Sequence, residues 1–123
     1  MKKLVILTLT WNAKEKLQAL YESLMPALEG IDWRWGIKDN GSIDQTVEMV
    51  EAWKSERIQV FAFKNNLQNY SQGNNWLCSQ MVPDDEDYIL MLNNDIVFQD
   101  SDSIKKMVSI LEKDKDVGVV GCK

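Results

Sequence analysis

Histidine is absent from this chain of 123 residues, and its absence excludes several kinds of catalytic site. Ser-His-Asp and Cys-His catalysis both need an imidazole to move a proton, and many zinc sites use imidazole ligands. Cysteine is scarce as well: Cys78 and Cys122 form no C-x-x-C pair and are too few for a disulfide scaffold or a four-cysteine zinc site. We therefore expect a reduced, cytoplasmic setting, and any bound metal ion must be held by oxygen.

Positive charge and long apolar runs are also lacking. Lys and Arg number 14 against 19 Asp and Glu, a net charge of −5, and no basic stretch suits a nucleic acid. No apolar run approaches the roughly 18 to 20 residues that span a bilayer, so we expect no integral membrane segment. Lys2 and Lys3 precede an apolar run as in a secretory signal, but the charged residues 14–16 follow at once without a small-residue cleavage site.

The composition that remains is that of a folded domain. Hydrophobic residues make up 45% and charged residues 27% of the chain, close to the averages of soluble globular proteins. A compact domain has about 100 to 150 residues, so we predict a single domain over residues 1–123.

Buried strands and amphipathic helices alternate along the chain. Residues 4–9 form a nearly continuous apolar, β-branched run of the kind found in buried strands, and further strands are predicted at 33–38, 58–63 and 88–92. Helical spacing of apolar residues follows the first, second and fourth runs, and a shorter helix ending near Met81 follows the third. The alternation predicts an α/β fold, a mostly parallel, Rossmann-like sheet flanked by helices. We also expect a short edge strand at 96–98 and a last strand at 117–120.

Polar residues suggest where the helices begin. Asn12 can cap the first helix, and Gly30 follows its end. Ser42 with Gln45 has the spacing of a capping box for the second helix. The third helix should begin between residues 71 and 74.

Every predicted strand ends in polar residues. Ligands of open α/β sheets bind beyond the carboxyl ends of the strands, near the point where strand order reverses. All nine asparagines fall in or beside these segments, and an amide offers donors and acceptors that suit a base edge or sugar hydroxyls. The same residue types also end strands and cap helices, which is the better interpretation of any one segment. Four such ends on one sheet edge favour a ligand site.

The buried run at 88–92 ends abruptly in Asn93, Asn94 and Asp95. A carboxylate at a strand end is a hard oxygen ligand, suited to Mg²⁺ or Mn²⁺ that also binds substrate phosphates. An ordinary turn is the alternative.

Taken together, four segments resemble the ordered motifs of the family 2 glycosyltransferases, with the rhamnosyltransferase-like members as the nearest type. They are VILTLTWN at 5–12, DNGSID at 39–44, NYSQGNN at 69–75 and LNND at 92–95. Each motif is weak alone, but their order and separation make chance an unlikely explanation. The resemblance covers residues 4–121 and implies a GT-A fold whose amino-terminal half binds a nucleoside-diphosphate sugar and a divalent cation, Mn²⁺ or Mg²⁺.

The resemblance also implies which residues bind the nucleotide. They follow the first two strands: Thr10, Trp11, Asn12, Asp39, Asn40 and Ser42. Among them, Asp39 would bond the pyrimidine edge, and Asn40 and Ser42 belong to the same base-binding turn.

Two further motifs complete the implied site. Asn94 would approach the ribose or the metal, and Asp95 would be the metal ligand, while Asn93 replaces the aspartate that usually opens this motif. The residues expected along the nucleotide and sugar are Asn69, Gly73 and Asn75. Asn69 takes the place of a usual glycine and should tolerate the same left-handed conformation.

The function implied is metal-assisted transfer of a sugar from a UDP- or dTDP-sugar to a hydroxyl of a saccharide or other acceptor. The carboxylate that deprotonates the acceptor is expected in a second half and has no position here. The alternative is a non-catalytic nucleotide-binding module, or an inactive fragment of a larger glycosyltransferase. A dehydrogenase is disfavoured because residues 10–13 lack G-x-G-x-x-G. Attachment to the cytoplasmic face of a membrane is suggested by the resemblance alone.

Aromatic and thiol side chains have mainly structural interpretations. Trp53 lies on a helical stripe, and Trp33 and Trp35 alternate along a strand, so we expect core positions for them. Of the five tryptophans, Trp11 alone falls where a ligand should be. Cys78 lies in a helical stretch without a basic neighbour, which favours a buried, unreactive thiol.

Overall fold

A four-stranded sheet with only parallel strand pairs forms the centre of the computed structural model, which describes residues 2–121. The strand order is β3-β2-β1-β4. The strands are β1 (Leu4–Thr10), β2 (Trp33–Asn40), β3 (Ile58–Phe63) and β4 (Tyr88–Met91), and the helices are α1 (Lys14–Ala27), α2 (Thr46–Glu51), α3 (Tyr70–Met81) and α4 (Ser103–Lys113). This confirms the predicted α/β fold and its flanking helices.

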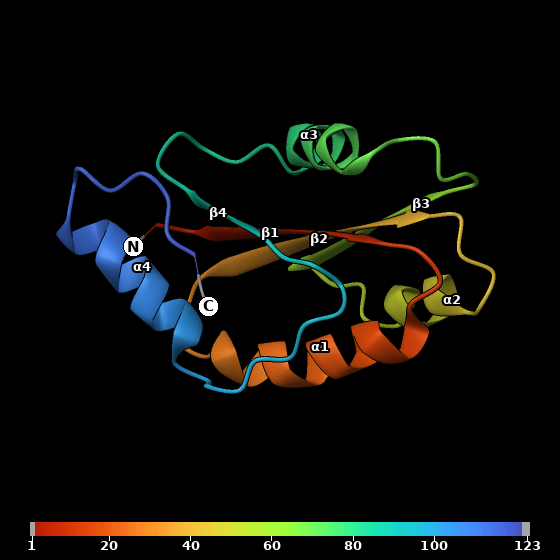
Figure 1. Cartoon of the computed structure of the whole chain (residues 1–123), viewed down its shortest axis with the longest axis horizontal. Helices are drawn as coiled ribbons and strands as arrows, with labels where there is room; N and C mark the ends of the chain where they lie inside the picture. Colours follow the sequence, from red (N-terminus) through yellow and green to blue (C-terminus); the bar gives the residue numbers. More distant parts are fainter. Residues whose placement is uncertain (1, 122–123) are drawn as a thin grey trace.

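The helices cover the sheet unequally. Figure 1 shows α1, α2 and α4 on one face and α3 alone on the other. The chain builds outward from β1 through β2 to β3 and then returns to place β4 on the other side of β1. The strand order therefore reverses between β1 and β4, where open α/β sheets bind their ligands.

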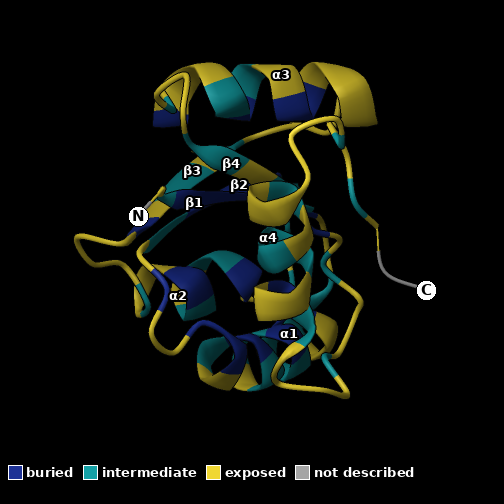
Figure 2. Ribbon diagram, turned by 90° about the vertical axis from the view of Figure 1, so that its left-hand side faces the viewer, coloured by how far each residue is buried: buried dark blue, intermediate teal, exposed yellow. Residues whose placement is uncertain are grey.

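Two hydrophobic clusters fill the space between these layers. Ile6 and Trp35 point toward α1, whereas Val5 and Leu7 pack under α3 against Leu77. Figure 2 shows this burial on the central strands β1 and β2 and on the sheet-facing sides of α1 and α3. Full burial on both faces explains why the β1 sequence is a continuous apolar run rather than an alternating one.

Of the three tryptophans expected in the core, Trp35 lies inside it, whereas Trp33 and Trp53 are half-buried and pack against it. Trp35 is fully buried, and its Nε1 donates to Thr8 Oγ1 at 2.9 Å. Trp53 packs against it with ring centroids 6.0 Å apart and stacks on Tyr21 at 4.2 Å.

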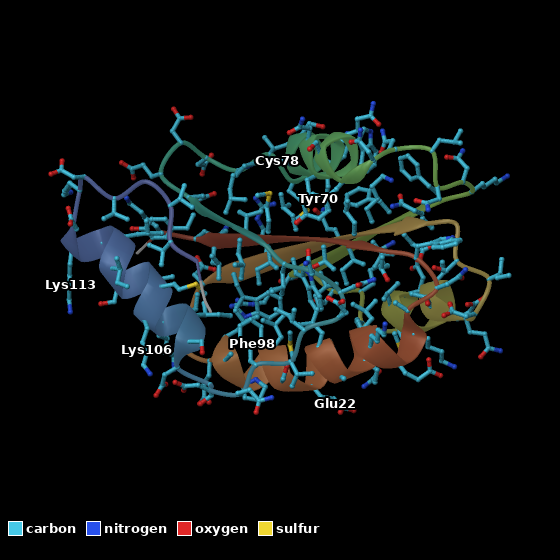
Figure 3. The ribbon with its side chains drawn as sticks, in the orientation of Figure 1. Glu22, Tyr70, Cys78, Phe98, Lys106 and Lys113 are labelled. Carbon is cyan, nitrogen blue, oxygen red and sulfur yellow. The ribbon has the colours of Figure 1, made fainter. Side chains whose placement is uncertain are left out.

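Neither of the two additional strands is formed. After β4 the chain leaves the sheet and runs along α1, where the Phe98 backbone N–H donates to Ser23 Oγ at 3.0 Å (Figure 3). Residues 117–120 pass near β4 without joining it, and Val119 is 90% exposed. An apolar run becomes a strand only where a neighbouring strand accepts its backbone hydrogen bonds, and within residues 2–121 neither segment has such a neighbour.

Three helix starts also differ from expectation. The Asn12 side chain does not cap α1, and α2 begins at Thr46 without the capping box predicted for Ser42 and Gln45. The capping box belongs to α3, where Asn69 Oδ1 accepts from the Gln72 backbone at 2.8 Å and Gln72 Oε1 accepts from the Asn69 backbone at 3.0 Å. The side chains expected as caps are used elsewhere, as the strand ends show.

Candidate functional site

The turn after β2 closes on the carboxylate of Asp39. This side chain is fully buried, and its Oδ2 accepts from the backbone N–H groups of Gly41 at 3.1 Å and Ser42 at 2.8 Å. Ser42 Oγ donates to Asp39 Oδ1 at 2.5 Å. Gly41 has φ of +90°, and a Cβ there would lie 3.1 Å from the backbone of Lys64, so glycine is required by both conformation and space.

Reciprocal hydrogen bonds join this turn to the end of β1. The Asn12 backbone N–H donates to Ser42 Oγ at 2.8 Å, and the Ile43 backbone N–H donates to Asn12 Oδ1 at 2.8 Å. Asn12 adopts a left-handed conformation with φ of 48°, which asparagine tolerates well. Its side chain therefore holds two loops together instead of capping α1.

Asp44 connects the starts of two helices. Its carboxylate accepts from the Lys14 backbone at 3.2 Å, from the Thr46 backbone at 3.1 Å and from the Thr46 hydroxyl. These bonds, the Thr46 hydroxyl first, lower the pKa of Asp44 and outweigh the opposing effect of burial. A negative charge at two helix N-termini is also favoured by the helix dipoles.

The end of β4 meets the end of β1 at the reversal of strand order. Asn94 Nδ2 donates to Oγ1 of the buried Thr10 at 3.1 Å. The next contact comes from α3, where Tyr70 Oη donates to Asn93 Oδ1 at 3.3 Å. Polar side chains from β1, β2 and β4 thus meet at one edge of the sheet, as predicted.

Asp95 is the exposed carboxylate of this edge. Among residues 2–121 no group of three or more acidic or cysteine side chains is placed to hold a metal ion. Mg²⁺ commonly takes only one or two protein carboxylates and completes its shell with phosphate oxygens and water. As an exposed carboxylate, Asp95 has the chemistry of such a ligand.

The α3 residues of the predicted site have structural contacts. Asn69 caps the helix with φ of −73°, so the expectation of a left-handed conformation there is wrong. A Cβ on Gly73 would approach Leu9 Cδ1 to 2.7 Å, so glycine lets α3 lie close to β1. Asn75 is exposed and lines a hollow between α3 and β4 that also includes Cys78 and Met91. Cys78 is half-buried on α3 rather than fully buried (Figure 3).

Trp11 and Asn40 occupy contrasting positions at the same edge. Trp11 is 51% exposed beside the β1 end, free to cover a ligand. Asn40 is 6% exposed, and its Oδ1 accepts from Lys38 Nζ beneath it. Sequence reasoning did not select Lys38 or Tyr70; a lysine within the predicted strand at 33–38, directly after Ile37, was the available signal for Lys38.

A parallel α/β sheet with polar strand ends bonded together at its reversal point has its ligand crevice there, and nucleotide-binding proteins are among those that use it. Residues 5–123 match the model of glycosyl transferase family 2, and the chain therefore belongs to that family.

Solved structures share the fold. TarS 1-349 from S. aureus superposes with a TM-score of 0.71 at 20% sequence identity, covering 92% of this chain and 33% of that one. The longer S. aureus TarS gives 0.70 at 20% identity, covering 92% and 20%. TarS 1-349 in complex with UDP-GlcNAc gives 0.71 at 20% identity, covering 92% and 32%. The chain thus spans about a third or less of these proteins and has the α/β fold predicted for the nucleotide-binding half of a GT-A fold.

A comparison with curated proteins gave no significant match. In the part of the chain that the structure describes, no helix has the length and apolarity to cross a membrane.

Proposed function

We propose that the chain binds the nucleotide-sugar donor of a glycosyltransferase, which moves the sugar to a hydroxyl of a saccharide or other acceptor. The hydrogen-bonded meeting of the β1, β2 and β4 ends is the observation that carries this proposal. Membership of glycosyl transferase family 2 supports the reaction class, and the TarS structures with UDP and UDP-GlcNAc support a uridine donor.

Different parts of the donor lie against different strand ends. Asn40 faces the pyrimidine base, Asp39 and Ser42 hold the base-binding turn, and Thr10 with Asn12 forms the wall on the β1 side. Trp11 lies over the nucleotide, and Asn94 approaches the ribose. On the β4 and α3 side, the residues that would lie along the nucleotide and sugar are Asn93, Asn69, Gly73 and Asn75. Fixed dipoles of this kind orient a nucleotide without having to reorganise when it binds.

Asp95 would hold a Mn²⁺ or Mg²⁺ ion together with the diphosphate. Such an ion offsets the negative charge that builds on the leaving diphosphate. Asn94 supports the same position, because its Nδ2 donates to Thr10 and its Oδ1 has no partner within residues 2–121 and can accept a ligand.

Donor binding without transfer is the second candidate. Transfer needs a carboxylate that deprotonates the acceptor. At this edge Asp39 and Asp44 already accept several hydrogen bonds each, and Asp95 is the proposed ligand of the cation, so none of these three carboxylates is left for that role. Turnover of a UDP-sugar by this chain would exclude that candidate.

Isothermal titration calorimetry with UDP and dTDP, with and without Mn²⁺, tests the proposal. We expect binding that Mn²⁺ strengthens, and we expect Asp95→Ala to lose the Mn²⁺-dependent part alone. Asp85→Ala, an exposed carboxylate on the segment before β4, is the matched control and should behave as wild type. Absence of binding to both diphosphates in the presence of Mn²⁺ would contradict the proposal.

A further inference from the structure

Lys38 places an ammonium group inside the protein, directly below the proposed base site. Its side chain is 0% exposed between β2 and α3. Nζ lies 3.9 Å from the ring centroid of Phe63 and 6.0 Å from that of Trp76. Aromatic faces and the neighbouring charge of Asp39 stabilise the cation, although burial lowers the pKa of Lys38.

The ammonium determines which way the Asn40 amide faces. Lys38 Nζ donates to Asn40 Oδ1, and an ammonium can only donate. The amide oxygen therefore faces Lys38, and Nδ2 is the free end. Asn40 is the last residue of β2, next to Asp39, so this free end lies at the ligand edge.

The Asn40 Nδ2 group has no acceptor within residues 2–121, although Asn40 is only 6% exposed. Nδ2 is not fully buried either, because the fully buried side-chain atoms that lack a hydrogen-bond partner in the described residues belong to Arg34, Gln68 and Tyr88. The group therefore reaches solvent and offers a donor to an incoming molecule.

We propose that Lys38 is a positioning residue that fixes Asn40 as a hydrogen-bond donor and so selects uracil or thymine, which have a carbonyl oxygen at C4, over cytosine, which has an amino group there. The inference rests on the proposed function, because it assumes that a nucleotide base binds beside Asn40. Uracil and thymine carry a carbonyl at the ring position where cytosine carries an amino group. A donor that meets the amino group leaves both groups unpaired, and sites of this kind reject the wrong partner strongly.

Lys38→Met removes the ammonium and keeps an apolar chain of similar length against Phe63 and Trp76. Without its anchor, the Asn40 amide can rotate and present its oxygen to cytosine. We expect wild type to bind UDP at least about tenfold more tightly than CDP. In Lys38→Met this ratio should fall to within about threefold, mainly through tighter CDP binding. Loss of packing alone would weaken both ligands and leave the ratio unchanged.

Asn40→Asp provides an independent variant. It replaces the donor by a carboxylate that still pairs with Lys38, so we expect the preference to shift toward CDP. Lys54→Met, an exposed lysine after α2, is the control for the loss of one positive charge and should keep the wild-type ratio.

Calorimetric dissociation constants for UDP and CDP, measured for all four proteins at the same Mn²⁺ concentration, test the inference. A preference for UDP that falls in Lys38→Met and shifts toward CDP in Asn40→Asp supports it. Equal affinities in wild type, or a preference that both variants retain, overturn it while leaving the proposed function standing. If wild type binds neither nucleotide, the proposed function fails and the inference fails with it. If Lys38→Met does not fold, the UDP and CDP affinities of Asn40→Asp alone decide whether the inference holds.

Discussion

At the scale of single residues, two aspartates hold the candidate site in shape. Asp39 closes the β2 turn through three hydrogen bonds, and Asp44 joins the starts of α1 and α2. Both side chains accept backbone N–H groups that would otherwise be unpaired at a strand end or a helix start. The site is therefore organised before a ligand arrives, which reduces the entropy that binding has to offset.

Asp44→Ala should lower the free energy of unfolding by about 1 to 2 kcal/mol, the usual cost of losing a helix cap. Urea denaturation of the variant and wild type measures this difference. Asp85→Ala, whose exposed side chain bonds no helix start, should change it little.

The Asp44 contribution also depends on pH. Because the pKa of Asp44 is lower in the folded state than its ordinary value of 3.8, the unfolded chain binds the proton first as pH falls. The stabilisation is complete above about pH 4 to 5 and is lost as pH falls through the folded pKa. The stability gap between wild type and Asp44→Ala should narrow over that range, and a gap that stays constant down to pH 2 would contradict the assignment.

Single residues were also where the sequence was least informative. Asp39, Ser42 and Thr10 were predicted at the edge because strand ends can be located from the apolar pattern. Lys38 was not selected, since its meaning depends on Phe63 and Trp76, which come from another strand and from α3. Contacts between residues far apart in the chain leave no local pattern.

At the scale of elements, the apolar periodicity predicted the strands and helices well, but the helix starts less well. One short polar side chain can cap a helix or form a hydrogen bond with one of several other partners. Asn12 bonds the turn after β2 instead of α1, because that turn lies across from it only in the folded sheet. The strands predicted at 96–98 and 117–120 failed for the related reason that a strand needs a neighbour.

The start of α3 offers a test at this scale. Asn69→Ala removes one half of the capping box and should cost about 1 kcal/mol of stability. The loss should be local: amide hydrogen exchange should accelerate at residues 70–73 and change little at the C-terminal end of the helix.

The control is Gln72→Glu, which keeps an acceptor for the Asn69 backbone N–H and should retain slow exchange. Equal acceleration along the whole of α3 would show that Asn69 does not act as the cap.

At the scale of the whole molecule, the order β3-β2-β1-β4 decides where the site is. Alternating strands and helices predicted a parallel sheet, but they did not specify which strand lies beside β1. The structure places β2 and β4 on its two sides, so their polar ends converge on Thr10 and Asn12. Convergence at the reversal point brings the separate polar turns together at one edge of the sheet.

Amide chemical-shift mapping by NMR, with UDP and Mg²⁺ added to labelled protein, tests the central claim most directly. We predict that the perturbed amides cluster at residues 10–12, 39–44 and 93–95, with saturation as UDP is increased. Perturbations confined to α4 and residues 84–87, at a distance from these strand ends, or no perturbation at all, would contradict a nucleotide site at the carboxyl edge of the sheet.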